Sequence, residues 1–74
     1  MSTVRDIAQQ FVVTATAEEG GKPKYWTGEM LGRWPVIVGN QERAARMELT
    51  VARRAVVEFG TRLGKFAWLT APAP

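Results

Sequence analysis

The chain has 74 residues, of which 46% are hydrophobic and 23% are charged, the balance of a soluble globular protein and not of a disordered tail. It contains no cysteine and no histidine, which excludes disulfides, thiolate nucleophiles, Cys/His zinc sites and a histidine general base. We expect one domain over residues 1–70 and a disordered Ala-Pro tail over residues 71–74. Because the apolar runs are too short to cross a bilayer and no secretory signal is visible, we expect a cytoplasmic protein.

The formal net charge of +3 is unevenly distributed. Residues 1–31 carry three basic and four acidic side chains, whereas residues 32–74 carry seven basic and three acidic ones. Seven of the ten basic residues are arginine, the side chain suited to bidentate contact with carboxylates or phosphates. The second half of the chain is therefore either an ordinary solvated surface or a face for an acidic protein or a nucleic acid.

The first predicted elements are a short helix or irregular arm, followed by a strand. Thr3 and Asp6 resemble a capping box, and apolar residues recur at helical spacing up to Phe11. From Gln10 to Ala17 the period changes to two, which predicts a strand with one buried face.

A hairpin and a third strand follow. Residues 18–23 (Glu-Glu-Gly-Gly-Lys-Pro) predict a turn because adjacent glycines adopt positive φ at no steric cost. The aromatic and β-branched residues of 24–30 predict the return strand. Gly32 interrupts the pattern, and residues 34–38 predict a third strand. Because Pro35 has no N–H to donate, this strand lies at a sheet edge or Pro35 lies at its start.

The segment after Asn40 has two interpretations. One is a single helix of about five turns. The other is a turn near residues 42–44, a brief extended Arg46-Met47, and a helix from residue 48 or 49 to Phe59. We favour the second because a break explains why Met47 would otherwise point away from the buried stripe. That stripe, at alternating spacings of four and three, is Ala45, Leu49, Ala52, Val56, Phe59 and Leu63.

Cap and pair signals accompany this helix. Asn40 is a good N-cap, and Gly60 is a natural residue just after a helix end. Arg54 and Glu58 have the spacing of an ion pair on the outer side. We read residues 61–65 as the helix exit alone.

Residues 65–70 predict a last strand, with Phe66 and Trp68 on one face and Ala67 and Leu69 on the other. Together the elements predict an α+β fold, a small antiparallel sheet of three to four strands with one main helix packed on one face.

The remaining reactive groups are not arranged for catalysis. Glu18 and Glu19 lie on a turn, the later acidic residues alternate with arginines, and the single serine is Ser2. No glycine-rich phosphate-binding pattern occurs. We therefore expect no enzyme, no cofactor, no metal site and no small-molecule substrate.

Aromatic and arginine side chains are the candidate binding residues. Tyr25 and Trp26 are adjacent on a strand and therefore face opposite sides of the sheet. Either Trp26 and Trp34 belong to the core, or an uncovered aromatic face rimmed by arginine binds a partner, as small RNA-binding sheets do. The candidate partner-binding residues are Tyr25, Trp26, Arg33, Trp34, Arg46, Arg53 and Arg54.

The layout of Lys-Tyr-Trp-Thr-Gly at 24–28, Arg-Trp at 33–34, Arg-Ala-Ala-Arg-Met at 43–47 and an alanine-rich helix resembles small orphan proteins of phages and mobile elements, among them the anti-CRISPR proteins. The resemblance concerns arrangement over residues 11–59 and carries over no functional residue. Many anti-CRISPR proteins are acidic mimics of nucleic acid, and the basic second half of this chain departs from that habit. The resemblance therefore implies another mode, such as covering a protein surface or competing for a partner's acidic patch.

The sequence leads to three hypotheses for function. The first is a non-enzymatic protein that binds a larger host protein or nucleoprotein complex stoichiometrically in the host cytoplasm, as a phage-encoded inhibitor of a CRISPR-type effector would. The second is a small basic module that contacts nucleic acid directly. The third is a self-assembling structural protein that pairs through the open edge of strand 34–38.

Overall fold

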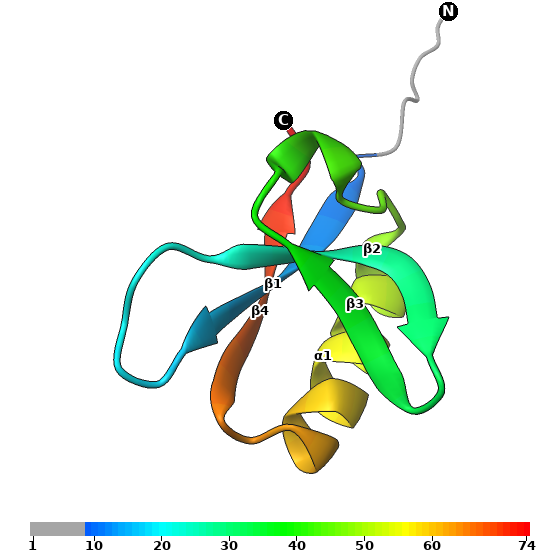
Figure 1. Ribbon diagram of the computed structural model, residues 1–74. Helices are drawn as coiled ribbons and strands as arrows, with labels where there is room; N and C mark the ends of the chain where they lie inside the picture. The colour runs from blue at the N-terminus through cyan, green and yellow to red at the C-terminus, as the bar shows by residue number, and fades with distance from the viewer. Residues whose placement is uncertain (1–8) are drawn as a thin grey trace, which may run out of the picture.

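The computed structural model describes residues 9–74, so the predicted N-terminal helix or arm lies, up to residue 8, outside the described residues. The elements follow in the order β1 (Phe11–Ala17), β2 (Lys24–Leu31), β3 (Trp34–Val38), a 3-10 helix η1 (Gln41–Arg43), α1 (Leu49–Arg62) and β4 (Phe66–Pro72). The strands form one antiparallel sheet in the order β3-β2-β1-β4, and α1 packs on β4 and β1 (Figure 1). The predicted α+β fold is confirmed.

Two turns connect the first three strands, and glycine contributes to both. The Gly20 N–H donates to the Ala17 carbonyl at 2.8 Å and closes the first turn, and Gly20 and Gly21 have φ of 93° and 108°. Leu31 pairs with Trp34 across the second turn, where Gly32 has a φ of 66°. Glycine at the first of two central positions is the usual choice for a tight hairpin turn. In the sheet order β3 is an edge strand, as Pro35 indicates.

β1 is buried on both faces, whereas the alternation predicted one buried face. Val13 and Ala15 project toward α1 and join the core. Val12 and Thr14 project to the opposite face and are nevertheless 1% and 8% exposed. β1 is a central strand, between β2 and β4 in the sheet. The buried Thr14 hydroxyl is satisfied because it donates to the Leu69 carbonyl at 3.3 Å.

Residues 41–47 follow the second interpretation, with a turn, an extended pair and a separate helix. Asn40 caps η1, and its side chain accepts a hydrogen bond from the Glu42 N–H at 2.9 Å. Met47 then forms a bridge with Phe11, with N···O distances of 2.7 and 2.9 Å. Because Met47 is extended, its side chain reaches the core instead of pointing away from it.

The helix α1 begins at Leu49 as expected but continues one turn past Phe59, so the predicted end at Phe59, with Gly60 just after it, is wrong. Leu63 caps the helix, donating from its N–H to the Phe59 carbonyl at 2.7 Å. The Trp68 indole N–H donates to the Leu63 carbonyl at 3.0 Å, which holds this last turn against β4. The longer helix also changes the ion pair, since Glu58 contacts Arg62 at 3.3 Å instead of Arg54.

The C-terminal strand extends into the predicted tail. β4 ends at Pro72, with Ala71 opposite Val12 and Pro72 opposite Phe11. The Ala73 N–H donates to the Gln10 carbonyl at 2.8 Å. The prediction of disorder for 71–74 is therefore wrong at residues 71 and 72. An edge strand accepts proline where no ladder donor is needed, and β4 is the second edge of the sheet.

The core centres on Phe59, which is 3% exposed. Its ring lies 4.9 Å from that of Trp26 on β2, edge to face, and 5.1 Å from that of Trp68 on β4. One side chain of α1 thus touches both halves of the sheet. The buried residues of this core are Val13, Ala15, Ala52, Ala55, Phe59 and Trp68.

Replacing Phe59 by alanine should destabilise the protein by about 3–5 kcal/mol, because a buried aromatic ring is removed and a cavity remains. A matched control is Val57→Ala, also on α1, because Val57 is 69% exposed and should change the free energy of unfolding by roughly 0.5 kcal/mol or less. Thermal or urea unfolding measures both. Equal melting curves for Phe59→Ala and the unmodified protein would contradict the placement of α1.

A second prediction concerns the bend in β2. The strand register shifts between Trp26 and Met30, and Gly28 within the bend has a φ of 88°. A Cβ atom on Gly28 would lie 3.0 Å from the Ala45 Cβ, whereas one on Gly21 would meet nothing within 4 Å. Gly21→Ala should cost about 1–2 kcal/mol from its φ alone, and Gly28→Ala roughly 1–3 kcal/mol more from overpacking. Equal losses in urea unfolding would show that residue 45 does not support the bend.

Candidate partner-binding cleft

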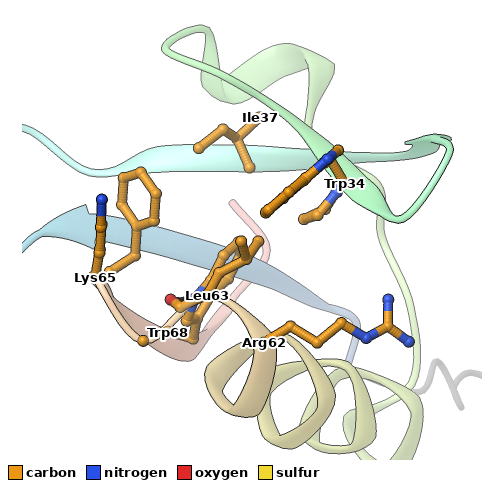
Figure 2. A pocket seen from close by; sticks show the side chains of 9 residues that line it. Trp34, Ile37, Arg62, Leu63, Lys65 and Trp68 are labelled. Atoms are coloured by element: carbon orange, nitrogen blue, oxygen red, sulfur yellow. Dashed lines mark hydrogen bonds between the residues drawn. The ribbon is translucent and has the colours of Figure 1, made fainter.

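A cleft lies between the β2–β3 hairpin and the layer formed by α1 and β4. We call it the hairpin cleft. α1 packs on β1 and β4, and the hairpin, at the other end of the sheet, faces this layer across the cleft. Figure 2 shows Trp34 and Ile37 of the hairpin on one side, and Leu63 and Trp68 on the other.

The cleft contains two cavities, one on each side of Arg62. The first, which we call the Trp34 cavity, has a volume of about 370 Å³ and is lined by Trp34, Pro35, Ile37, Arg62, Leu63, Gly64, Lys65, Phe66 and Trp68. The second, the Met30 cavity, has a similar volume of about 370 Å³ and is lined by Trp26, Gly28, Met30, Val51, Arg54, Ala55, Glu58, Phe59 and Arg62. The walls of the Trp34 cavity are mostly apolar, with a cation at Arg62 and another at Lys65.

The tip of the hairpin exposes large apolar side chains beside the cleft. Leu31 is 74% exposed, Trp34 59% and Met30 42%. Leu31 and Trp34 are cross-strand partners, and Met30 pairs with Pro35, so the three side chains belong to one end of the hairpin. Exposed apolar residues grouped in this way mark interaction sites more often than isolated ones do.

Arg62 connects the helix to the hairpin across the cleft. Its guanidinium donates to the Glu58 carboxylate and to the Arg33 carbonyl, each at 3.3 Å. A guanidinium has five N–H donors, so these two contacts orient the side chain and leave donors to receive a further acceptor. Glu58 lies one turn before Arg62 on the same helix face, which is the geometry of an i,i+4 pair.

Four of the seven candidate residues lie at the hairpin cleft. Trp34 and Arg54 line its cavities, and Arg33 borders it through the carbonyl bonded to Arg62. Trp26 forms part of its floor, because its ring packs on Phe59 and its indole N–H donates to the Glu29 carbonyl at 2.9 Å. Trp26 is therefore partly buried against the core, whereas Trp34 is 59% exposed on the surface.

The other three candidates lie elsewhere. Tyr25 is half-buried and projects from β2 to the side opposite Trp26. Arg46 is exposed between η1 and α1. Arg53 is exposed on α1, and at 3.6 residues per turn it points away from Arg62, nine residues on.

The residues that α1 and β4 contribute to the cleft were not predicted as binding residues. Arg62, Leu63 and Lys65 fall in the segment that we read as the helix exit alone, and Phe66 follows it. One signal was present, since Arg62 is four residues after Glu58 and thus offers Glu58 a second arginine partner besides Arg54.

Among residues 9–74, no three His, Cys, Asp or Glu side chains come together as a metal site. In the same part of the chain, no helix is long and apolar enough to cross a membrane. The cleft offers apolar side chains, a positioned guanidinium and an ammonium group, which bind other molecules through apolar contact and charge.

The chain matches no family model, no curated protein and no solved structure in comparisons with known proteins.

Trp34→Ala should change the free energy of unfolding by about 0.5 kcal/mol or less, because the side chain is already mostly in water. Trp68 is 6% exposed, so Trp68→Ala should cost about 3–5 kcal/mol. Urea unfolding of the two variants measures the difference. A loss for Trp34→Ala as large as that for Trp68→Ala would show that Trp34 is a core residue and that the cleft is closed.

Proposed function

We propose that this protein is a non-enzymatic binding protein that contacts a larger protein partner stoichiometrically through the hairpin cleft. The observation that supports this most is the exposure of Trp34 and Leu31 beside an apolar cavity. The other two tryptophans pack against Phe59 in the core, whereas Trp34 does not. An exposed tryptophan next to arginine is a frequent combination at binding hot spots.

A protein partner fits the cleft better than a nucleic acid does. Non-specific nucleic-acid binding needs several cations that follow one phosphate backbone. The exposed arginines among residues 9–74 are instead distributed over η1, the segment between η1 and α1, both flanks of α1 and the hairpin tip. At the tip, Leu31 and Met30 accompany the single aromatic ring of Trp34. Aliphatic side chains bury well against protein but offer no flat surface on which a base stacks.

The outer edge of β3 has few backbone N–H donors with which a second copy of the chain could pair. The Val36 carbonyl accepts a hydrogen bond from the Thr27 hydroxyl at 3.3 Å, so the backbone N–H and C=O of Val36 point toward β2. By alternation the backbone groups of Trp34 and Val38 also point toward β2, and those of Pro35 and Ile37 point to the outer edge of the sheet. Since proline has no N–H, Ile37 offers the outer edge its one donor, which disfavours the addition of a further strand.

A more specific form of the proposal is that this protein inhibits a host effector complex, which is the function that the likeness to anti-CRISPR proteins implies. The departure from acidic nucleic-acid mimicry fits an inhibitor that covers a protein surface instead. This form of the proposal is tested by adding the purified chain, at equimolar amount, to a CRISPR-type effector of the native host and measuring cleavage of target DNA. Undiminished cleavage would contradict it.

The proposed function is tested by capture of partners from the native host with the tagged chain, with and without nuclease, followed by affinity measurement on the purified partner. We expect a partner that survives nuclease treatment and a rise in Kd of roughly thirtyfold for Trp34→Ala, which is a hot-spot loss of about 2 kcal/mol. Val57→Ala, an equally exposed apolar site on the outer face of α1, should leave Kd unchanged.

The opposite results identify the alternative. If capture requires nucleic acid and binding weakens steeply with salt, the chain is a nucleic-acid module. If Arg53→Glu with Arg54→Glu abolishes binding while Trp34→Ala does not, the contact lies on the helix face and not on the hairpin.

A further inference from the structure

The Trp34 cavity combines an apolar interior with positive charge and carries no carboxylate of its own. Its apolar walls come from three parts of the fold, namely Trp34, Pro35 and Ile37 on β3, Leu63 after α1, and Phe66 and Trp68 on β4. Its charged lining residues are Arg62 and Lys65, and Glu58 is absent from it. The volume of about 370 Å³ is at the lower end of ligand cavities, which suits one or two apolar side chains.

Arg62 is held in place before any partner arrives. The Glu58 carboxylate and the Arg33 carbonyl each accept from it at 3.3 Å, one from the helix and one from the hairpin. Its side chain is 42% exposed, so an incoming acceptor reaches the guanidinium without a change in the fold. Because the rotamer is already restricted, less side-chain entropy is lost when a carboxylate binds.

Lys65 lies at the other end of the cavity from Arg62 (Figure 2). It also lines a shallow hollow with Glu18 and Glu19, so part of its field is offset by these carboxylates. Arg62 is the cation that hydrogen bonds hold in position, although its partner Glu58 also offsets part of its charge. The charged side chains that line the cavity are both cations, so an acidic occupant suits it better than a basic one.

We infer that the Trp34 cavity binds a segment of the partner protein in which an apolar side chain is flanked by carboxylates, with the apolar side chain between Trp34 and Trp68 and a carboxylate on Arg62. This inference rests on the proposed function and adds the chemistry of the partner to it. The segment recognised is short, because the cavity accommodates few side chains. Its specificity comes from the two charged ends and its affinity from the apolar walls.

The test uses the full chain and two blocked peptides, Ac-Glu-Leu-Phe-Glu-NH₂ and its neutral counterpart Ac-Gln-Leu-Phe-Gln-NH₂, titrated in low salt and followed by NMR of the indole N–H groups. The Trp34 resonance should shift, and the acidic peptide should bind roughly threefold to tenfold more tightly, the range expected between an exposed and a partly buried charge contact. In Arg62→Gln this preference should be clearly smaller, because Lys65 is then the remaining cation of the cavity.

Arg53→Gln is the matched control, because Arg53 is an exposed arginine on the flank of α1 that points away from Arg62. It should retain the preference for the acidic peptide. Comparing the two peptides within each variant removes any effect of the substitution on folding, since both affinities are measured on the same protein.

Three results would overturn the inference. They are equal affinity of the acidic and neutral peptides for the unmodified chain, an unchanged preference in Arg62→Gln, and stronger binding at Trp34 of a short oligothymidine than of the acidic peptide. Failure of the inference is distinguishable from failure of the proposed function. A captured protein whose binding depends on Trp34 but not on Arg62 overturns the inference alone, whereas capture that is indifferent to Trp34 overturns the proposed function.

Discussion

The packing of the Phe59 ring between two indoles is the contact on which the rest of the structure depends. Trp26 belongs to the hairpin and Trp68 to the last strand, and these two rings lie 4.9 and 5.1 Å from Phe59. A domain of this size gains only a few kcal/mol from its core, so one aromatic cluster carries a large share of it. The cluster also fixes where α1 lies, because Phe59 is the largest buried side chain that the helix contributes.

The cleft follows from this arrangement. Phe59 contacts the hairpin at Trp26, which pairs with Ile37 toward the open end, and the strand register shifts beyond Trp26. Arg62 spans the resulting gap through the Arg33 carbonyl and divides it into two cavities. Trp34, on this tip, is 59% exposed. Binding surface and core are thus two consequences of the same helix position.

Local signals predicted most of the fold, and the misses have physical reasons. The glycine pair at 20–21 and Pro35 indicated the first turn and the edge strand, because each restricts the backbone by itself. The end of α1 and the reach of β4 were wrong because long-range contacts decide them. The last turn of the helix is held by the Trp68 indole, and the strand continues because residues 71 and 72 pair with β1.

The cleft was predicted only in part for a similar reason. Counting by alternation fails across the bend in β2, so sequence alone does not separate a core tryptophan from an exposed one, and the contribution of Arg62 depends on how near the hairpin comes to the helix.

The helix position is tested most directly by nuclear Overhauser contacts among the aromatic rings of the protein in solution. We expect strong contacts from the Phe59 ring to both Trp26 and Trp68, and none from Phe59 to Trp34. A contact between Phe59 and Trp34, with Trp26 in solvent, would contradict this helix position, because the hairpin would then present its other tryptophan to the helix and the cleft would be filled.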